Sequence, residues 1–488
     1  MSDIQLPEDD EEQQLYERET ENTPETPLIR RSQSHESIIS TLSAPPAYEL
    51  YPPATTWSGR LLNFFRRIPT RFTQSSIALP TLSDDDRADE RSISSRFRIP
   101  LLELHPRIAR WRYPIVGLCV LCITIFSFLL FCSIFFSPAS LPSPSVPDKI
   151  ANDTAKFLTL NIFMRPPGVK NNWSDYKDDR TDFIIRHVLP NYDVVSFQES
   201  FGFGSRRKDH LIRAAREMGY NHHVESGRKY PWQIAVDGGL LVLSRFPIKD
   251  SKLIEYPRGR HSDWMARKGA IYAQIECKPN SLVHLYTTHA QASYQPITSL
   301  WDDDVRTRMN QFSWLHSLIA ETSGNDGSAV IVNGDLNVDA AVHKEKSSPT
   351  EPSEESSEEY DFMKAVLSGE GKKINGKIEY EDSWKINLKD AVYKSYGFHP
   401  VTFGDVKVDE YGMVVPAETV LTDADELMAV QSIDHVLWSP RQSDMNVEGV
   451  RVEKFMVADT HLDNDEEQEK GYTQASGECN TYTNQLMF

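Results

Sequence analysis

Residues 329–339, with the sequence AVIVNGDLNVD, hold the pair of side chains best suited to chemistry. The apolar run predicts a buried strand, and Asp335 and Asn337 follow at its carboxyl end, two apart and on one face. A carboxylate beside an amide can hold a divalent cation and position a phosphate oxygen or an attacking water. Ordinary turn chemistry after a strand explains the same residues, so the functional interpretation depends on partners elsewhere.

Polar residues follow other predicted strands in the same way. They are Asn161 after residues 157–160, Gln198 and Glu199 after residues 194–197, His289 after residues 283–286, and Asp434 within residues 433–437. Each residue alone has a structural explanation, such as a capping Asn or a surface Glu. Ligands of α/β proteins collect outside strand ends, so the repetition predicts a site.

These strands belong to one α/β domain, residues 155–488, in which short apolar strands alternate with helical stretches. Strands are predicted at residues 156–160, 194–197, 239–243, 269–275, 283–286, 330–332 and 432–437. Helices are predicted at residues 180–188, 208–218 and 306–322. Residues 343–359 are acidic and lack core-forming side chains, which predicts a disordered loop.

The charge of the chain disfavours nucleic-acid binding. The formal net charge is -19, from 52 basic and 71 acidic residues. Residues 1–112 hold 14 Arg, no Lys and 18 acidic residues, so the part after the apolar run carries a net charge of -15. Such a body does not bind polyanions by bulk electrostatics, although a local cation site can still attract a phosphate.

Residues 113–136 form 24 positions without a charge, enough to span a bilayer as a helix. The run begins too far from Met1 to be a cleaved signal peptide. Arginines crowd its amino-terminal side, so the positive-inside rule predicts a type II membrane protein with residues 1–106 cytosolic and the large domain luminal or extracellular. Sequons at Asn152 and Asn172 agree with that side and predict a glycoprotein.

The tail, residues 1–106, is rich in Ser, Pro, Glu and Arg and is predicted to be disordered. Pro45, Pro46 and Tyr48 resemble a WW-domain ligand, with a plain linker as the alternative. Residues 59–72 alternate Arg with Leu and Phe, which fits a basic segment on an anionic membrane face. Residues 137–154 are predicted to be a Pro/Ser stalk.

The chain has five cysteines, which limits the possible disulfides and cysteine-based metal sites. Three lie in the apolar run, which leaves Cys277 and Cys479 for the large domain. At most one intrachain disulfide is therefore possible there, and no cysteine-based zinc site fits.

Seven motifs occur in the order found in the endonuclease/exonuclease/phosphatase superfamily, and their wording resembles its neutral sphingomyelinase branch. They are LNIF at 160–163, QES at 198–200, GGL with LSRFP at 238–247, KG at 268–269, THAQA at 288–292, GDLN at 334–337 and IDHVL at 433–437. The resemblance covers about residues 156–437.

The resemblance implies a four-layered α/β sandwich, two packed mixed sheets flanked by helices, with Mg²⁺ (or Mn²⁺) in a cleft at the strand ends. Glu199 would be the principal metal ligand, with Asn161 close by as metal and phosphate contact. Asp335 and Asn337 would orient the water and the scissile phosphate. His289 would stabilise charge on the phosphate.

Asp434 would orient the imidazole that deprotonates the attacking water. The family supplies this base from a carboxyl-terminal Ser-Asp-His, and no such tripeptide follows Asp434 here. The most similar context, residues 471–476, continues as Gly-Glu-Cys, and the alternative base is His461. Three hypotheses stay open: an inactive relative, a base supplied by His461, or a mistranslated end, which the polar sequence GECNTYTNQLMF favours because it is a poor core strand.

The leading interpretation is a membrane-anchored phosphodiesterase that releases a phosphorylated head group from a membrane sphingolipid such as sphingomyelin. A nuclease is disfavoured by the negative body and an inositol-phosphate phosphatase by the luminal topology. A non-catalytic binding module is the alternative from another class. Trp264, Tyr294 and Trp301 suit a membrane interface, but core packing is the favoured expectation for each.

Overall fold

The computed structural model describes most of the chain after residue 110. The described residues are 111–171, 175–343, 353–374, 376–404, 406–422, 426–455 and 480–487. The predicted tail and its WW-type motif lie outside them, as do the sequon at Asn172, Cys479 and His461.

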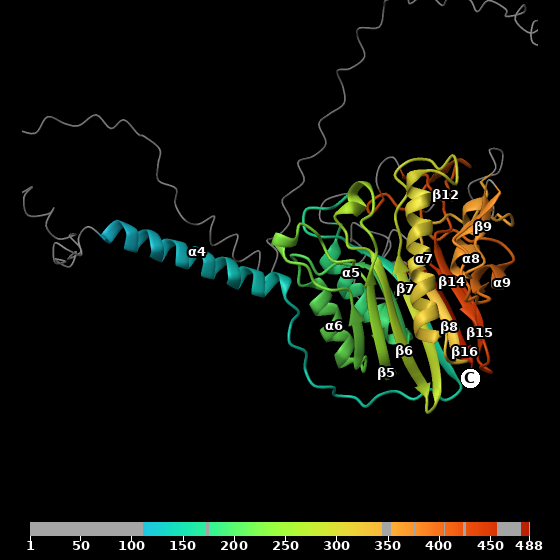
Figure 1. Cartoon of the computed structure of the whole chain (residues 1–488), viewed down its shortest axis with the longest axis horizontal. Helices are drawn as coiled ribbons and strands as arrows, with labels where there is room; N and C mark the ends of the chain where they lie inside the picture. Colours follow the sequence, from blue (N-terminus) through green and yellow to red (C-terminus); the bar gives the residue numbers. More distant parts are fainter. Residues whose placement is uncertain are drawn as a thin grey trace, which may run out of the picture. The chain divides into compact units, whose positions relative to one another are not determined.

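Helix α4, Arg112–Phe136, is the one helix in the described part of the chain that is long and apolar enough to cross a membrane (Figure 1). Its span Tyr113–Phe136 has a hydropathy of 2.8. Most of its large apolar side chains are exposed. An apolar surface on all sides of a helix suits contact with lipid better than packing on one face of a soluble core.

Two six-stranded sheets form the body (Figure 1). The first sheet has the order β15-β16-β1-β2-β4-β3, formed by Asn446–Glu453, Asn480–Met487, Thr154–Met164, Val194–Ser200, Leu241–Ser244 and His222–Glu225. The second has the order β11-β14-β8-β7-β6-β5, formed by Lys389–Asp390, Asp434–Ser439, Ala329–Asp335, Ser281–His289, Gly269–Lys278 and Ile248–Glu255. Both sheets are mixed: β1 with β2 and β7 with β8 are parallel pairs, and the other pairs are antiparallel.

Helices and two small hairpins surround these sheets. The α-helices of the body are α5 Lys177–Phe183, α6 Arg207–Glu217, α7 Asp303–Ser323, α8 Glu358–Leu367 and α9 Ala391–Tyr396. Single turns occur at η2 Ile184–Val188, η3 Leu189–Asn191, η4 Pro231–Gln233 and η5 His261–Trp264. The hairpins are β9 Lys372–Ile374 with β10 Lys377–Glu379, and β12 Val406–Val408 with β13 Val414–Pro416.

Three apolar cores separate four layers, which confirms the predicted sandwich. The central core joins the sheets through residues such as Phe157, Val242, Leu285 and Ile331. One outer core packs α5 and α6 on the first sheet, and the other packs α7 and α8 on the second. Side chains alternate between the two faces of a strand, so strands such as β1 and β8 contribute residues both to the central core and to an outer core.

The seven predicted strands and three predicted helices are present, with ends shifted by a few residues. The sequence analysis missed β3 and β5, in which no residue is fully buried. It also underrated the carboxyl terminus: residues 480–487 form β16, which lies between β15 and β1. Backbone pairing on both sides gives this polar sequence a place in the sheet that its composition did not predict.

Two segments expected to be irregular are held by contacts. Of the predicted loop 343–359, residues 353–359 form bridges to the body and the start of α8, whose Ser357 caps the helix by accepting from the Tyr360 N–H. The predicted stalk, residues 137–154, is hydrogen-bonded to the body at several backbone positions. Low apolar content did not predict either outcome, because backbone groups supply most of these contacts.

Candidate active site

The candidate site lies between the two sheets, at the ends of β1 and β2 on one side and of β7 and β8 on the other. A buried polar layer separates it from the central core. Gln198 Nε2 donates to Thr159 Oγ1 (3.2 Å) and to Thr287 Oγ1 (3.0 Å). Thr159 and Thr287 lie two residues beyond Phe157 and Leu285 of the central core, so alternation along β1 and β7 puts them on the same inward face. The inward-facing side chains therefore change from apolar to polar toward these strand ends.

Asn161 joins the two sheets in the next layer. Its Nδ2 donates to Asp335 Oδ2 at 3.0 Å and to Glu199 Oε1 at 3.4 Å. Its Oδ1 accepts from the Phe163 N–H at 3.1 Å, which fixes the amide orientation. Asn161 is 1% exposed. This one amide sets the separation of two carboxylates that would otherwise repel each other.

Glu199 is the penultimate residue of β2 and adopts a left-handed backbone conformation, with φ 53°. Gly239 makes room for that backbone, because a Cβ there would lie 3.1 Å from Glu199 Cα. Glu199 Oε2 is buried and has no hydrogen-bond partner among the described residues. A buried carboxylate oxygen without a donor is costly unless a cation or substrate completes it.

Asp335 lies at the end of β8, 2% exposed. It pairs in register with His289 on β7 and with Asp434 on β14. Burial raises the pKa of Asp335 to about 6, and the charge of Glu199 adds to this, whereas Lys268 and the Asn161 amide oppose it. The carboxyl group is thereby brought close to the range in which it can exchange a proton.

Lys268 contacts His289 at the ring nitrogen Nε2. Its Nζ lies 3.1 Å from His289 Nε2 and also donates to Asp263 Oδ2 (2.8 Å) and to the Ala290 carbonyl (2.6 Å). Burial, and then the Lys268 charge, hold the pKa of His289 well below its usual value, so the ring is neutral. His289 Nε2 also lies 3.3 Å from Asp335 Oδ2, so it can accept from Lys268 or donate to Asp335, according to which ring nitrogen carries the proton. His289 Nδ1 has no partner within the described residues, and in the tautomer that carries the proton there it can donate to a phosphate oxygen.

Asn337 and Asp434 occupy the remaining predicted positions. Asn337 adopts φ 54° just after β8, and its Nδ2 donates to the Ala290 carbonyl at 3.1 Å. Asp434 is 2% exposed, and its N–H donates to Thr402 Oγ1 at 3.0 Å. The structure therefore brings six of the seven predicted site residues together, and the seventh, His461, lies outside the described residues.

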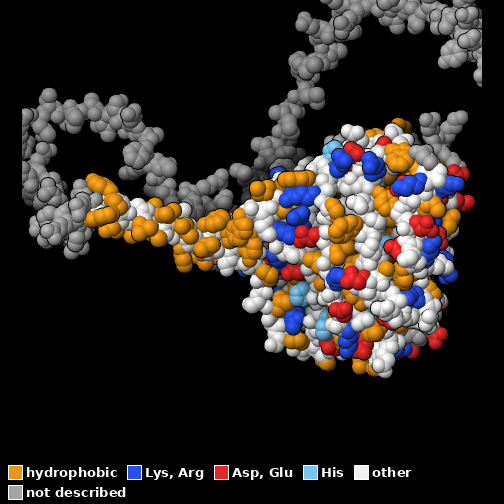
Figure 2. All heavy atoms as spheres, viewed as in Figure 1, with side chains coloured by type: hydrophobic (Ala, Val, Ile, Leu, Met, Phe, Trp, Pro, Cys, Tyr) orange, Lys and Arg blue, Asp and Glu red, His pale blue; other side chains and the backbone are white. Residues whose placement is uncertain are grey.

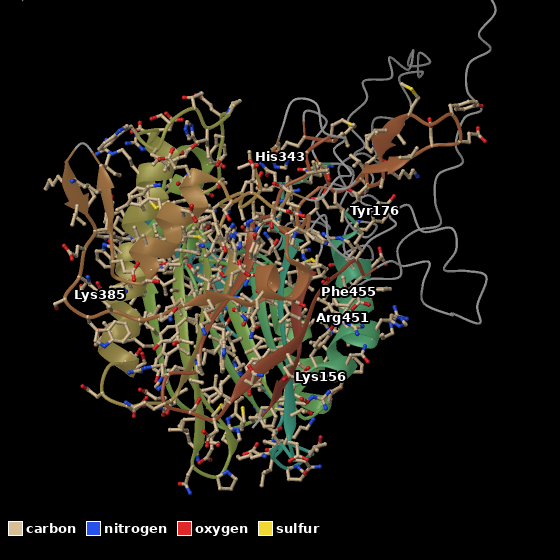
Figure 3. All side chains as sticks on the ribbon, turned by 90° about the vertical axis from the view of Figure 1, so that its right-hand side faces the viewer. Lys156, Tyr176, His343, Lys385, Arg451 and Phe455 are labelled. Carbon is tan, nitrogen blue, oxygen red and sulfur yellow. The ribbon has the colours of Figure 1, made fainter. Side chains whose placement is uncertain are left out.

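The site opens into a cleft of about 1350 Å³ whose lining includes Glu199, Lys268, His289, Asp335 and Asn337. A second imidazole lines the same cleft: His343 Nε2 lies 2.7 Å from Asp339 Oδ2, and this contact raises the pKa of His343. Figure 3 shows His343 at the upper end of the body. The sequence analysis passed over His343 because it placed that residue in the predicted loop.

Two lysines and two aspartates that support the site were also missed. Lys268 was noted only as part of a motif, although a charge directly before the buried strand β6 is a signal in itself. Asp237 is buried, accepts from the Gly202 N–H (3.0 Å) and pairs with Lys208 (3.0 Å), which holds the loop after Glu199. Asp263 neutralises Lys268, as described above.

The expected core packing of three aromatic residues is wrong. Trp264 is 46% exposed, Tyr294 39% and Trp301 50%. They lie on loops beyond the strand ends, where no layer of the sandwich covers them.

The side chains at the candidate site suit Mg²⁺, which needs few protein ligands, better than a metal ion that is coordinated entirely by protein side chains. The described residues contain no group of three or more His, Cys, Asp and Glu side chains that could hold a metal ion. Mg²⁺ is commonly bound by one or two carboxylates with water and substrate phosphate as the other ligands. Glu199 lines the cleft and has a buried Oε2 without a hydrogen-bond partner among the described residues, so it can supply such a carboxylate. Asn161 directs its Nδ2 donor at Glu199 and its Oδ1 at the Phe163 N–H, so its role as a metal ligand stays a prediction.

Carboxylate, amide and imidazole groups thus meet at facing strand ends of a two-sheet sandwich. The chain belongs to the Endonuclease/Exonuclease/phosphatase family, whose model matches residues 158–451.

Within this family the chain is similar to sphingomyelinases. It is 28% identical over 336 residues to a sphingomyelinase of Dictyostelium discoideum, covering 62% of this chain and 68% of that protein. It is 28% identical over 198 residues to a sphingomyelinase C of Bacillus cereus, covering 38% of this chain and 58% of that protein. The solved sphingomyelinase C of Streptomyces griseocarneus covers 69% of this chain and is itself covered completely, with a TM-score of 0.45 and 20% identity.

Proposed function

We propose that the chain is a membrane-anchored, Mg²⁺-dependent phosphodiesterase that hydrolyses sphingomyelin, or a related sphingolipid, to ceramide and a phosphorylated head group. The observation that carries the proposal is the convergence of Asn161, Glu199, His289 and Asp335 in one cleft. Likeness to sphingomyelinases over most of the body supports the lipid substrate.

Each group has a role in attack of water on a phosphodiester. Mg²⁺ at Glu199 would neutralise charge on the phosphate. His289 Nδ1–H would donate to a phosphate oxygen, and Asn337 would hold the phosphate in position. Asp335 would orient the attacking water.

The general base is assigned to His461, with Asp434 as its orienting carboxylate. His343 is the second candidate, because it lines the cleft and has a carboxylate partner of its own. A catalytically impaired binding module is the competing function, favoured by the absence of Ser-Asp-His after Asp434 in the sequence.

Helix α4 would anchor the enzyme as a type II membrane protein, with the body luminal or extracellular and glycosylated at Asn152, which is exposed. The anchor keeps the cleft near its lipid substrate and raises the effective concentration. On the cytosolic side, Pro45, Pro46 and Tyr48 would bind a WW-domain protein.

Mg²⁺-dependent release of phosphocholine from sphingomyelin in mixed micelles by the full chain tests the proposal. Activity lost in Glu199→Ala and His461→Ala but kept in His343→Ala would support the assigned base. Activity lost in His343→Ala but kept in His461→Ala would assign the general base to His343. A folded chain that binds Mg²⁺ without turnover would leave the binding module as the function.

A further inference from the structure

Six large apolar side chains are exposed on three loops beside the cleft, and we refer to them as the apolar rim. They are Trp232 (57% exposed), Ile234 (65%), Trp264 (46%), Met265 (41%), Ile297 (40%) and Trp301 (50%). Met265 and Ile297 line the cleft itself. Trp264 lines a neighbouring cavity with Arg258 and His261. Isolated exposed apolar residues need no explanation, but a set on loops that are joined to one another and reach the cleft does.

The three loops are joined to one another. The Val236 N–H donates to the Met265 carbonyl (2.9 Å), and the Arg267 N–H donates back to Val236 (3.1 Å). The second and third loops meet where Tyr294 hydrogen-bonds Ser262 and its ring contacts His261 in a tilted arrangement, with ring centroids 4.8 Å apart. The rim is therefore held as one surface.

Helix α4 continues this surface. Phe136 contacts Phe203 of the cleft wall, with centroids 4.8 Å apart, and Phe128 contacts Trp232 at 6.4 Å. Figure 2 shows hydrophobic side chains along α4 and on the part of the body beside it. Phe128 lies eight residues before Phe136, or about 12 Å along the helix axis. A bilayer that surrounds α4 down to Phe136 therefore also reaches Trp232.

Residues 137–149, which we call the strap, fix this arrangement. The Ala139 N–H donates to Asp209 Oδ1 (3.1 Å), Arg216 Nε donates to the Pro142 carbonyl (2.7 Å), and Asn221 Nδ2 donates to the Val146 carbonyl (2.8 Å). The strap thus runs along α6 toward β3 instead of forming a free tether. A tether of this length without contacts would let the body turn in any direction.

The composition of the rim favours a lipid surface over a protein partner. Tryptophans are enriched where proteins meet the lipid head groups, and Arg258 lies over the Trp264 ring at 4.0 Å, which suits the same level. Because Trp232 of the rim contacts Phe128 of α4, the lipid surface that the rim would meet is that of the bilayer that α4 itself spans.

We infer that the apolar rim inserts into the membrane spanned by α4, and that the strap holds the cleft on that membrane, so that the enzyme acts on lipids of its own bilayer. This inference rests on the membrane anchor of the proposed function, but not on turnover.

Quenching of tryptophan fluorescence by brominated phosphatidylcholine tests the rim without requiring activity. The full chain is reconstituted in vesicles with and without the brominated lipid. We expect the quenchable emission to fall at least about twofold in Trp232→Phe/Trp264→Phe/Trp301→Phe, because these side chains lie at membrane depth. Trp314→Phe is the matched control, since Trp314 is 47% exposed but lies on α7. Equal quenching in the triple variant and the wild type would overturn the inference.

The strap is tested by Arg213→Ala/Arg216→Ala, which removes two surface side chains that donate to the carbonyls of Ser140 and Pro142. A second variant inserts a Gly/Ser segment after Ser143, leaving the body unchanged. Vesicles carrying the protein are mixed with separate vesicles of sphingomyelin, and hydrolysis in each population is measured. Both variants should lose rim quenching and shift hydrolysis toward the separate vesicles. Unchanged quenching in both variants would overturn the role of the strap. Absence of sphingomyelin hydrolysis by the wild-type chain in micelles would count against the proposed phosphodiesterase activity and not against the rim or the strap.

Discussion

Asn161 Nδ2 lies 3.0 Å from Asp335 Oδ2, and this hydrogen bond joins residues 174 positions apart that belong to different sheets. The same amide nitrogen lies 3.4 Å from Glu199 Oε1. The carboxylate that would hold the metal and the carboxylate that would orient water are thus positioned by one side chain.

Asn161→Ala should reduce hydrolysis by about 100-fold or more, because the two carboxylates of the candidate site, Glu199 and Asp335, lose their shared donor. It should also lower the free energy of unfolding by about 1 to 3 kcal/mol, the cost of leaving a buried acceptor without its donor. Kinetics and urea unfolding measure both effects. Asn191→Ala, at an exposed site, is the control and should change neither. Normal activity in Asn161→Ala would show that the bridge between the sheets is dispensable.

Removal of divalent metal by EDTA should abolish hydrolysis, and Mg²⁺ should restore it. Glu199→Ala should weaken Mg²⁺ binding, measured by calorimetry, by about 100-fold or more, because it removes a cleft-lining carboxylate whose Oε2 has no hydrogen-bond partner among the described residues. Glu448→Ala removes an exposed carboxylate from β15 and should bind Mg²⁺ as the wild type does. Undiminished Mg²⁺ binding by Glu199→Ala would place the metal elsewhere.

Arg308 ties α7 to the segment after His289 and to α8. Arg308 is fully buried. Its guanidinium group donates to Glu359 Oε1 (2.7 Å) and to the Gln291 carbonyl (3.0 Å). Arg308→Leu should destabilise the protein by about 3 to 5 kcal/mol, because Glu359 is left as a buried charge without a partner. Arg308→Met combined with Glu359→Met should recover much of this loss in urea unfolding. A double variant no more stable than Arg308→Leu would mean that packing, not charge, dominates here.

His399 predicts a pH dependence of stability. Burial lowers its pKa to about 4, and its Nε2 lies 2.9 Å from Ser356 Oγ. Below pH 6.5 the unfolded state binds a proton that the folded state does not, so stability falls as the pH falls from 6.5 to 4. Between pH 7 and pH 5 the loss due to His399 should be about 2 kcal/mol.

His399→Gln, which keeps a hydrogen-bonding group but does not titrate, should flatten this part of the stability curve. Urea unfolding at several pH values compares the two chains. An unchanged difference between pH 7 and pH 5 in the variant would assign the effect to other groups.

The sequence by itself determined which residues face inward. Alternation along the strands puts Asp335, His289 and Asn161 on the same face as the apolar residues of the central core, and the order of the motifs indicated the sandwich and the candidate site. It also determined the apolar span of α4. Local patterns are sufficient for these properties because each depends on a few neighbouring residues.

Only the tertiary structure decided which of these residues touch. Pairing of β16 between β15 and β1, the contact of Lys268 with His289, and the docking of residues 137–149 on α6 depend on groups far apart in the chain. Many of those contacts are made by backbone carbonyls and N–H groups, which every residue carries, so composition does not reveal them. The exposure of Trp264 and Trp301 likewise follows from where the layers of the sandwich end, a property that no short segment encodes.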